Sequence, residues 1–115
     1  MLLDEVQNKL EKFDEHVFYG VVDDRMREML WNYIVFNRTR LKSSANKTGY
    51  GDYFDVHIVR ENFIPEGLDT DIIAKVLEID GVRLCSDDGV YNYVRKNNTG
   101  NVVEMLTLSF VRARK

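Results

Sequence analysis

Hydrophobic residues recur at helical spacing in two stretches of the chain. In residues 2–13 the apolar positions share one helix face between acidic and basic residues, and they are Leu3, Val6, Leu10 and Phe13. The second stretch follows Pro65, which suits the first turn of a helix, and it ends before Gly81, a natural C-cap. Its apolar stripe consists of Leu68, Ile72, Ile73, Val76, Leu77 and Ile79. These patterns predict two amphipathic helices.

Short runs of β-branched and aromatic residues predict six strands. They cover residues 17–22, 31–36, 52–61, 82–86 and 90–95, followed by a long last strand after residue 100. In that last strand Leu106, Leu108 and Phe110 share one face, while Thr107 and Ser109 share the other. Turns are expected at residues 87–89 and 96–100, and residues 25–29 are compatible with a single helical turn.

The predicted order of elements is α-β-β-β-α-β-β-β. A chain of 115 residues suits one domain, residues 1–115, and the order indicates an α+β fold. We expect a largely antiparallel sheet of about six strands with two helices packed on it. A mixed sheet stays open as an alternative, because the helix between the third and fourth strands could be a crossover that makes one pair parallel.

The segment of residues 37–51 differs from the rest because it has no periodicity and no acid before residue 52. It holds the cations Arg38, Arg40, Lys42 and Lys47. We interpret it as a mobile basic loop, either simply solvated or used as a contact surface for an acidic partner or DNA. The same contact role is expected of Tyr50, next to the loop, and of the basic C-terminal residues Arg112 and Arg114, for which a frayed tail is the simpler alternative.

Composition restricts the class of protein further. The chain is 44% hydrophobic and 30% charged, with a formal net charge of −3, which argues against a dedicated nucleic-acid binder. No apolar run is long enough to span a membrane, and the first ten residues carry acids where a signal peptide has a basic start. With Cys85 as the only cysteine, an internal disulfide is excluded. We therefore expect a soluble intracellular domain.

Catalytic and metal-binding patterns are missing from the sequence. The two histidines, His16 and His57, have no ligand-type spacing, and we expect ordinary surface or sheet roles for both. Cys85 is expected to be a buried, inert thiol inside a strand. We expect no enzyme activity, no metal and no cofactor, although an active site assembled across an oligomer interface would leave no single-chain pattern.

Four segments, in order along the chain, carry a resemblance to a known family. They are VFYG at residues 17–20, WNYIVFNR at 31–38, YFDVHIVRENFIPEG at 53–67 and YNYVRKNNTGNVVEMLTLSFVRARK at 91–115. Together they cover well over half of the chain. Read whole, they resemble the small neck and tail-completion proteins of tailed bacteriophages and prophages of Gram-positive bacteria.

The resemblance implies a structural virion protein, a tail terminator or head-to-tail joining subunit. Such proteins have small α+β folds and assemble as rings, often hexameric, at the top of the tail tube. The implied partners are copies of the chain itself, tail-tube proteins and head-connector proteins. The implied location is the virion neck or tail, and the bacterial host cytoplasm during assembly. The family offers no metal, nucleotide or catalytic motif to transfer.

Two functions therefore remain in view. In the first, the basic loop orders only in the assembled ring, against acids of a neighbour, of the tail tube or against passing DNA. In the second, the protein is a nucleic-acid-binding accessory module that uses residues 37–51 together with Tyr50, Tyr53 and Phe54, since basic and aromatic residues are combined in single-strand platforms.

Overall fold

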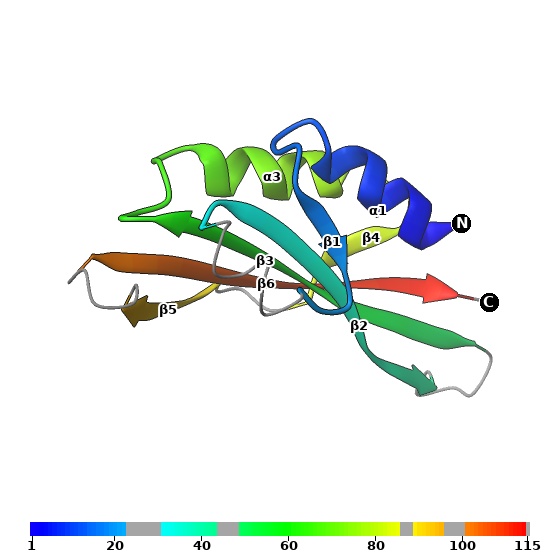
Figure 1. Ribbon diagram of the computed structural model, residues 1–115. Helices are drawn as coiled ribbons and strands as arrows, with labels where there is room; N and C mark the ends of the chain where they lie inside the picture. The colour runs from blue at the N-terminus through cyan, green and yellow to red at the C-terminus, as the bar shows by residue number, and fades with distance from the viewer. Residues whose placement is uncertain (23–30, 44–48, 86–88, 96–100, 115) are drawn as a thin grey trace.

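The computed structural model describes residues 1–22, 31–43, 49–85, 89–95 and 101–114. In this part of the chain six strands form one sheet, and two helices lie side by side on one of its faces (Figure 1). The helices are α1 (Leu2–Leu10) and α3 (Leu68–Val76). The strands are β1 (Val17–Tyr19), β2 (Tyr33–Ser43), β3 (Tyr50–Glu61), β4 (Val82–Leu84), β5 (Val90–Arg95) and β6 (Val102–Arg114). The predicted α+β fold and the order of its elements are confirmed.

Three long antiparallel strands form the centre of the sheet. Strand β3 pairs with β2 on one side, and with β6 on the other over its whole length, from Tyr50 opposite Arg114 to Glu61 opposite Val103. Strand β1 extends the sheet beside β2, while β4 and β5 lie one after the other along the outer edge of β6. Strands β3 and β6 are therefore central, and β1, β4 and β5 lie at the two edges of the sheet.

The sheet is mixed, as the open alternative allowed, but the parallel pair is β1 with β2. The helix between the third and fourth strands does not make β3 and β4 neighbours, because β6 lies between them and pairs antiparallel with both. Helix α3 thus carries the chain over β6 to the far side of that strand.

The main core lies between the sheet and the helices. Alternate residues of β2, β3 and β6 point to this side and are buried there, which is the reason that a two-residue period was readable in the sequence. The rings of Phe54 and Phe110 stack in the middle, with centroids 5.4 Å apart. The helices contribute Val6, Leu10, Ile72 and Val76, all fully buried.

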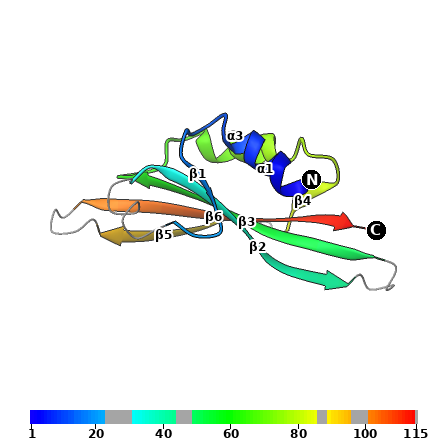
Figure 2. The same cartoon turned by 45° about the vertical axis from the view of Figure 1, so that its right-hand side comes forward.

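The opposite face, which we call the outer face, carries a smaller apolar cluster over the half of the sheet near β1. Its buried members are Val22, Tyr33, Val59 and Val103. Phe18, Trp31, Val35 and Met105 are partly buried against them. Within the described residues, both helices lie on the face away from this cluster, as the turned view also shows (Figure 2).

The prediction of a long basic loop is wrong for most of residues 37–51. Strand β2 continues through Ser43, and β3 already begins at Tyr50, so Arg38 and Lys42 are in ladder register with Phe54 and Gly51. We call this extension, residues 38–43 with 50–53, the arm; it projects beyond the helix layer in Figure 1. Apolar alternation is absent there because residues 38–43 are exposed on both faces.

Several smaller expectations also need correction. The helices are shorter than predicted, ending at Leu10 and Val76, and the first strand ends at Tyr19, before the left-handed Gly20. Cys85 follows β4 and is exposed, so the prediction of a buried thiol is wrong. The helical turn expected at residues 25–29 and the turn cluster at 96–100 lie outside the described residues, as do two of the three residues of the 87–89 turn.

Candidate interaction surfaces

The structure brings together most of the residues predicted to make contacts. Arg38, Arg40 and Lys42 lie on β2, Tyr50 opens β3, and the basic C-terminal pair lies on β6 next to them in the ladder. Arg112 and Arg114 are therefore part of an ordered strand rather than a frayed tail. Lys47 lies outside the described residues.

On the helix side of the arm, carboxylates pair with two of the arginines. The Arg112 guanidinium lies 3.0 Å from the Glu5 carboxylate of α1, and that of Arg114 lies 3.3 Å from Asp52. Arg114 also lies 6.0 Å from the centre of the Tyr50 ring. These ion pairs are partly exposed, so they are worth little to stability, but they offset the charges of Arg112 and Arg114; Arg38, opposite Phe54 on the same side, has no carboxylate partner among the described residues.

The outer face of the arm is different, because its cations have no carboxylate partner within the described part of the chain. One row across the sheet reads Arg40, Tyr53, Val111 and Arg83, residues that are direct neighbours on β2, β3, β6 and β4. The next row reads Lys42, Gly51 and Ala113. Cations thus stand on both sides of a floor of small and apolar residues.

The register places this floor in a groove, which we call the cationic groove. It is lined by Lys42, Ser43, Tyr50, Gly51, Tyr53, Arg83, Val111 and Ala113. The Arg40 guanidinium stacks over the Tyr53 ring at 4.3 Å, within the range of a cation–π contact. Because stacking occupies the plane of the guanidinium, its N–H groups at the edge remain directed outwards and can bind a carboxylate or phosphate.

Gly51 gives the groove its shape. A Cβ atom at this position would lie 3.2 Å from Cε2 of Tyr53 and 3.3 Å from Cγ2 of Val111. Both contacts are tight, so the absent side chain lets the tyrosine ring lie against the strand. The Tyr53 ring in turn supports the Arg40 guanidinium. The glycine at position 51 of β3 therefore helps to position a cation of β2.

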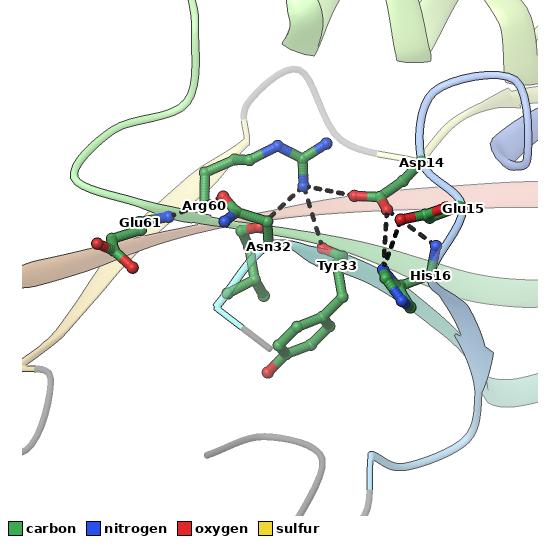
Figure 3. Close-up of polar contacts among 8 residues, drawn as sticks. Asp14, Glu15, His16, Asn32, Tyr33, Arg60 and Glu61 are labelled. Atoms are coloured by element: carbon green, nitrogen blue, oxygen red, sulfur yellow. Dashed lines mark hydrogen bonds and ion pairs between the residues drawn. The ribbon is translucent and has the colours of Figure 1, made fainter. Parts of the chain in front are cut away.

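The other end of the sheet carries a cluster of buried and half-buried polar groups (Figure 3). The Arg60 guanidinium, on β3, lies 3.0 Å from the Asp14 carboxylate in the connection between α1 and β1. It also donates to the carbonyl oxygen of Val59 at 2.9 Å. Both charged side chains are about nine-tenths buried, so this ion pair fixes the α1–β1 connection to the sheet.

His16 belongs to the same cluster. Its backbone N–H donates to the Asp14 carboxylate at 2.9 Å, and its Nδ1 atom lies 3.8 Å from carboxylate oxygens of both Asp14 and Glu15. The Asp14–Arg60 pair was not predictable from the sequence, because the two residues lie 46 positions apart and only the fold joins them. The cluster holds the α1–β1 connection in place, and an open pocket lined in part by Asp14, Glu15, Asn32 and Arg60 lies beside it.

His57 occupies a polar position on the outer face. Its Nε2 atom lies 3.0 Å from the side-chain oxygen of Asn37 and its Nδ1 atom 2.9 Å from the hydroxyl of Thr107. Since the Asn37 oxygen can only accept, Nε2 carries the hydrogen and Nδ1 accepts from Thr107. Burial lowers the pKa of His57, against a smaller opposite effect of the Asp55 charge. His57 is therefore neutral and tied to two strands, as the expectation of a sheet role required.

Metal sites and membrane spans are not found among the described residues. In that part of the chain, no group of three or more His, Cys, Asp or Glu side chains is placed to hold a metal ion. No helix among the described residues has the length and apolar character needed to cross a membrane. The features that stand out are contact surfaces.

In comparisons with known proteins, the chain matches no protein-family model and no curated protein.

Proposed function

We propose that the protein is a structural subunit that acts by self-assembly into a ring, as a tail terminator or head-to-tail joining protein of a tailed bacteriophage. In this proposal a hexameric ring at the top of the tail stops tail growth and presents a surface to the head connector. The proposal combines the resemblance of the four sequence segments with a sheet whose unusual features are surfaces for contact.

The observation that carries the proposal is the arm. From Arg38 onwards β2 keeps its pairing with β3, although its side chains are exposed on both faces. Strand β6 supports β3 on the other side of the arm, but the exposed side chains of β2 bury little apolar surface there and so add little to folding. A protein that extends its central strands beyond its own core presents them to another molecule.

The shape of the chain fits end-to-end contacts. Its extents are 52 × 27 × 23 Å, twice as long as wide, with the arm at one end and the β3–α3 connection at the other. Contacts between different ends of identical subunits are head-to-tail contacts, and these close into a ring when the rotation between neighbours permits.

Light scattering after size-exclusion chromatography tests the proposal, with the protein alone and mixed with the tail-tube protein of the same phage. We expect a closed oligomer in at least one of these conditions, and ring-shaped particles by electron microscopy. A variant in which Asn-Gly replaces residues 41–52 shortens the arm but keeps Phe54, and we expect it to remain folded and fail to assemble. A protein that stays monomeric at every concentration, with and without tail-tube protein, contradicts the proposal.

Nucleic-acid binding is the second candidate, and the unpaired cations of the outer face favour it. Arg40, Lys42 and Arg83 are the kind of groups that contact phosphates. Fluorescence anisotropy with short DNA at two salt concentrations separates the candidates. Binding that weakens steeply with salt, and that is lost in Arg40→Ala/Lys42→Ala, supports this second function; unchanged anisotropy at low salt excludes it.

A further inference from the structure

The connection between β3 and α3 holds an aromatic side chain out in solvent. Phe63 is 66% exposed, although the residue after it, Ile64, is buried. The backbone on both sides is fixed: the Asn62 N–H donates to the carbonyl oxygen of Val102 at 2.7 Å, and the Ile64 N–H donates to the Glu104 carboxylate at 2.8 Å. Phe63 is therefore presented by an anchored backbone rather than by a frayed loop.

Backbone strain at the preceding residue supports this interpretation. Asn62 has a φ of +72°, the only positive φ among the described residues other than glycine. Asparagine tolerates the left-handed region better than most residues, but the conformation still costs free energy. The exposed ring of Phe63 and the strained backbone of Asn62 each lower the stability of the folded chain. Both features are explained if the Phe63 ring contacts a binding partner.

Acidic residues lie on both sides of Phe63 in the sequence. Glu61 and Glu66 flank it in the sequence, and Asp69 and Asp71 follow in the first turn of α3. Against these four acids the segment of residues 61–71 contains no Lys or Arg. We call residues 61–66 the acidic knob: a held aromatic side chain with a carboxylate on each side of it in the sequence, at Glu61 and Glu66.

The cationic groove has the complementary features. Its floor is small and apolar, at Gly51, Val111 and Ala113, and Lys42 and Arg83 line its two sides. An aromatic side chain on that floor would bring the flanking carboxylates towards those cations. Aromatic anchors that enter small pockets and are ringed by charge pairs are the usual centre of a protein interface.

We infer that the acidic knob of one copy of this chain docks into the cationic groove of the next copy. Within one molecule the two surfaces cannot meet, because β3 separates Tyr53 from Glu61 by eight residues, about 26 Å of extended strand. The occupant of the groove is thus a second copy, and the contact joins unlike ends. The inference rests on the proposed function, for which it supplies the contact between neighbouring subunits.

Charge reversal tests this pairing with three preparations measured by sedimentation velocity. Arg40→Glu/Lys42→Glu reverses the groove, and Glu61→Lys/Glu66→Lys reverses the knob. We expect each variant alone to lose assembly, because every contact then joins like charges. An equimolar mixture regains assembly, since the reversed groove of one variant meets the reversed knob of the other.

Phe63→Ala tests the aromatic anchor, with Val90→Ala on β5 as the control because that side chain is also apolar and exposed, at 53%, and belongs to neither surface. We expect Phe63→Ala to raise the concentration at half-assembly about 30-fold, as loss of an interface anchor does. We expect Val90→Ala to leave it unchanged. Circular dichroism confirms that both exposed-site variants are folded.

The outcomes separate the inference from the proposed function. If wild-type protein assembles, and both charge-reversed variants and Phe63→Ala assemble equally well, the inference is wrong and the ring proposal stands. If reversal of the groove abolishes binding of short DNA and leaves assembly intact, the groove is a nucleic-acid site and the inference is again wrong. If wild-type protein never assembles, both fail together.

Discussion

Strand β2 contains two regions that are built on opposite principles. Its first residues, Tyr33 to Phe36, are buried or half-buried between apolar layers, whereas its last six, in the arm, are all exposed. The hydrogen-bonded ladder with β3 runs through both, interrupted only by a shift of register between Arg38 and Arg40. Backbone pairing therefore continues about six residues beyond the point at which hydrophobic burial stops.

The covered half of β2 contributes to folding stability, whereas the arm is available for contact with other molecules. In the covered half, side chains lose water against other parts of the same chain, which is the main source of folding free energy. In the arm, the side chains of β2 are all exposed and bury little apolar surface. We expect substitutions in the covered half to change the free energy of unfolding, and substitutions in the arm to change association.

The largest contrast is expected from removal of apolar side chains. Phe110→Ala removes a fully buried ring that stacks on Phe54, and we expect it to lower the free energy of unfolding by about 3–5 kcal/mol. Leu41→Ala, on the arm and 54% exposed, should change it by less than about 0.5 kcal/mol. Urea unfolding followed by circular dichroism measures both. Comparable losses would mean that the arm belongs to the folding core.

Ion pairs should show the next largest contrast. Asp14→Asn leaves the Arg60 guanidinium nine-tenths buried without its carboxylate, and we expect a loss of about 3 kcal/mol. Asp52→Asn breaks the exposed pair with Arg114, for which we expect less than about 1 kcal/mol. The same urea titration serves for both. If Asp52→Asn is the more costly of the two, burial does not control these pairs.

A smaller effect is expected from pH, and it belongs to the covered half. Burial lowers the pKa of His57 in the folded protein, whereas the usual pKa of histidine, about 6.5, applies to the unfolded chain. The folded protein therefore binds a proton at His57 less readily than the unfolded chain does. The contribution of His57 to stability is therefore complete above that pH and is lost as the pH falls from about 6.5 towards the lower pKa of the folded state.

Urea midpoints between pH 7.5 and 5.5 measure this effect, and His57→Gln is the control because glutamine does not titrate. We expect the wild-type midpoint to fall with pH more steeply than that of the variant. Parallel pH profiles would show that His57 is not the group responsible. Proton NMR of the imidazole, with its midpoint below 6.5, gives an independent measurement.

The smallest effect on stability is expected at the arm residue with the most specific contact. Arg40→Met keeps a long apolar side chain but removes the cation over Tyr53, and we expect less than about 1 kcal/mol of lost stability. Assembly should nevertheless weaken several-fold, since a cation of the groove is gone. A variant with normal assembly and markedly lower stability would reverse the distinction between the two regions.

The sequence predicted the covered half well because burial there imposes a period on the side chains. Leu106, Leu108 and Phe110 alternate with polar residues, and the structure places all three in the core. It failed in the arm, because residues 38–43 of β2 are exposed on both faces and leave no apolar period to detect. A strand that is exposed on both faces has no apolar periodicity, and neither does a loop. The pattern of side chains therefore could not distinguish the two in this segment.

The sequence indicated which residues belong to the candidate surfaces, but not how these residues are arranged on the two faces of the sheet. The cations of the arm were identified as contact residues, but their division into a partly neutralised and an unpaired face depends on the register shift between Arg38 and Arg40. Arg83 joins the groove only because β4 pairs with β6. The sequence carried one available signal for Phe63, an aromatic residue in a short segment between Glu61 and Glu66, but its exposure follows from the hydrogen bonds of Asn62 and Ile64.

Strand β6 has a consequence for the synthesis of the protein. It pairs with β3, β4 and β5, which all precede it in the sequence, and its ladder with β3 joins positions as far apart as Tyr50 and Arg114. Until β6 leaves the ribosome, one edge of β3 has no partner and the apolar side chains of Phe54, Val56 and Ile58 lack part of their cover. Completion of the sheet therefore waits for β6 and is dominated by the slow closure of long loops. A nascent chain halted before residue 102 would expose an apolar strand edge, the kind of surface that chaperones bind and that aggregates.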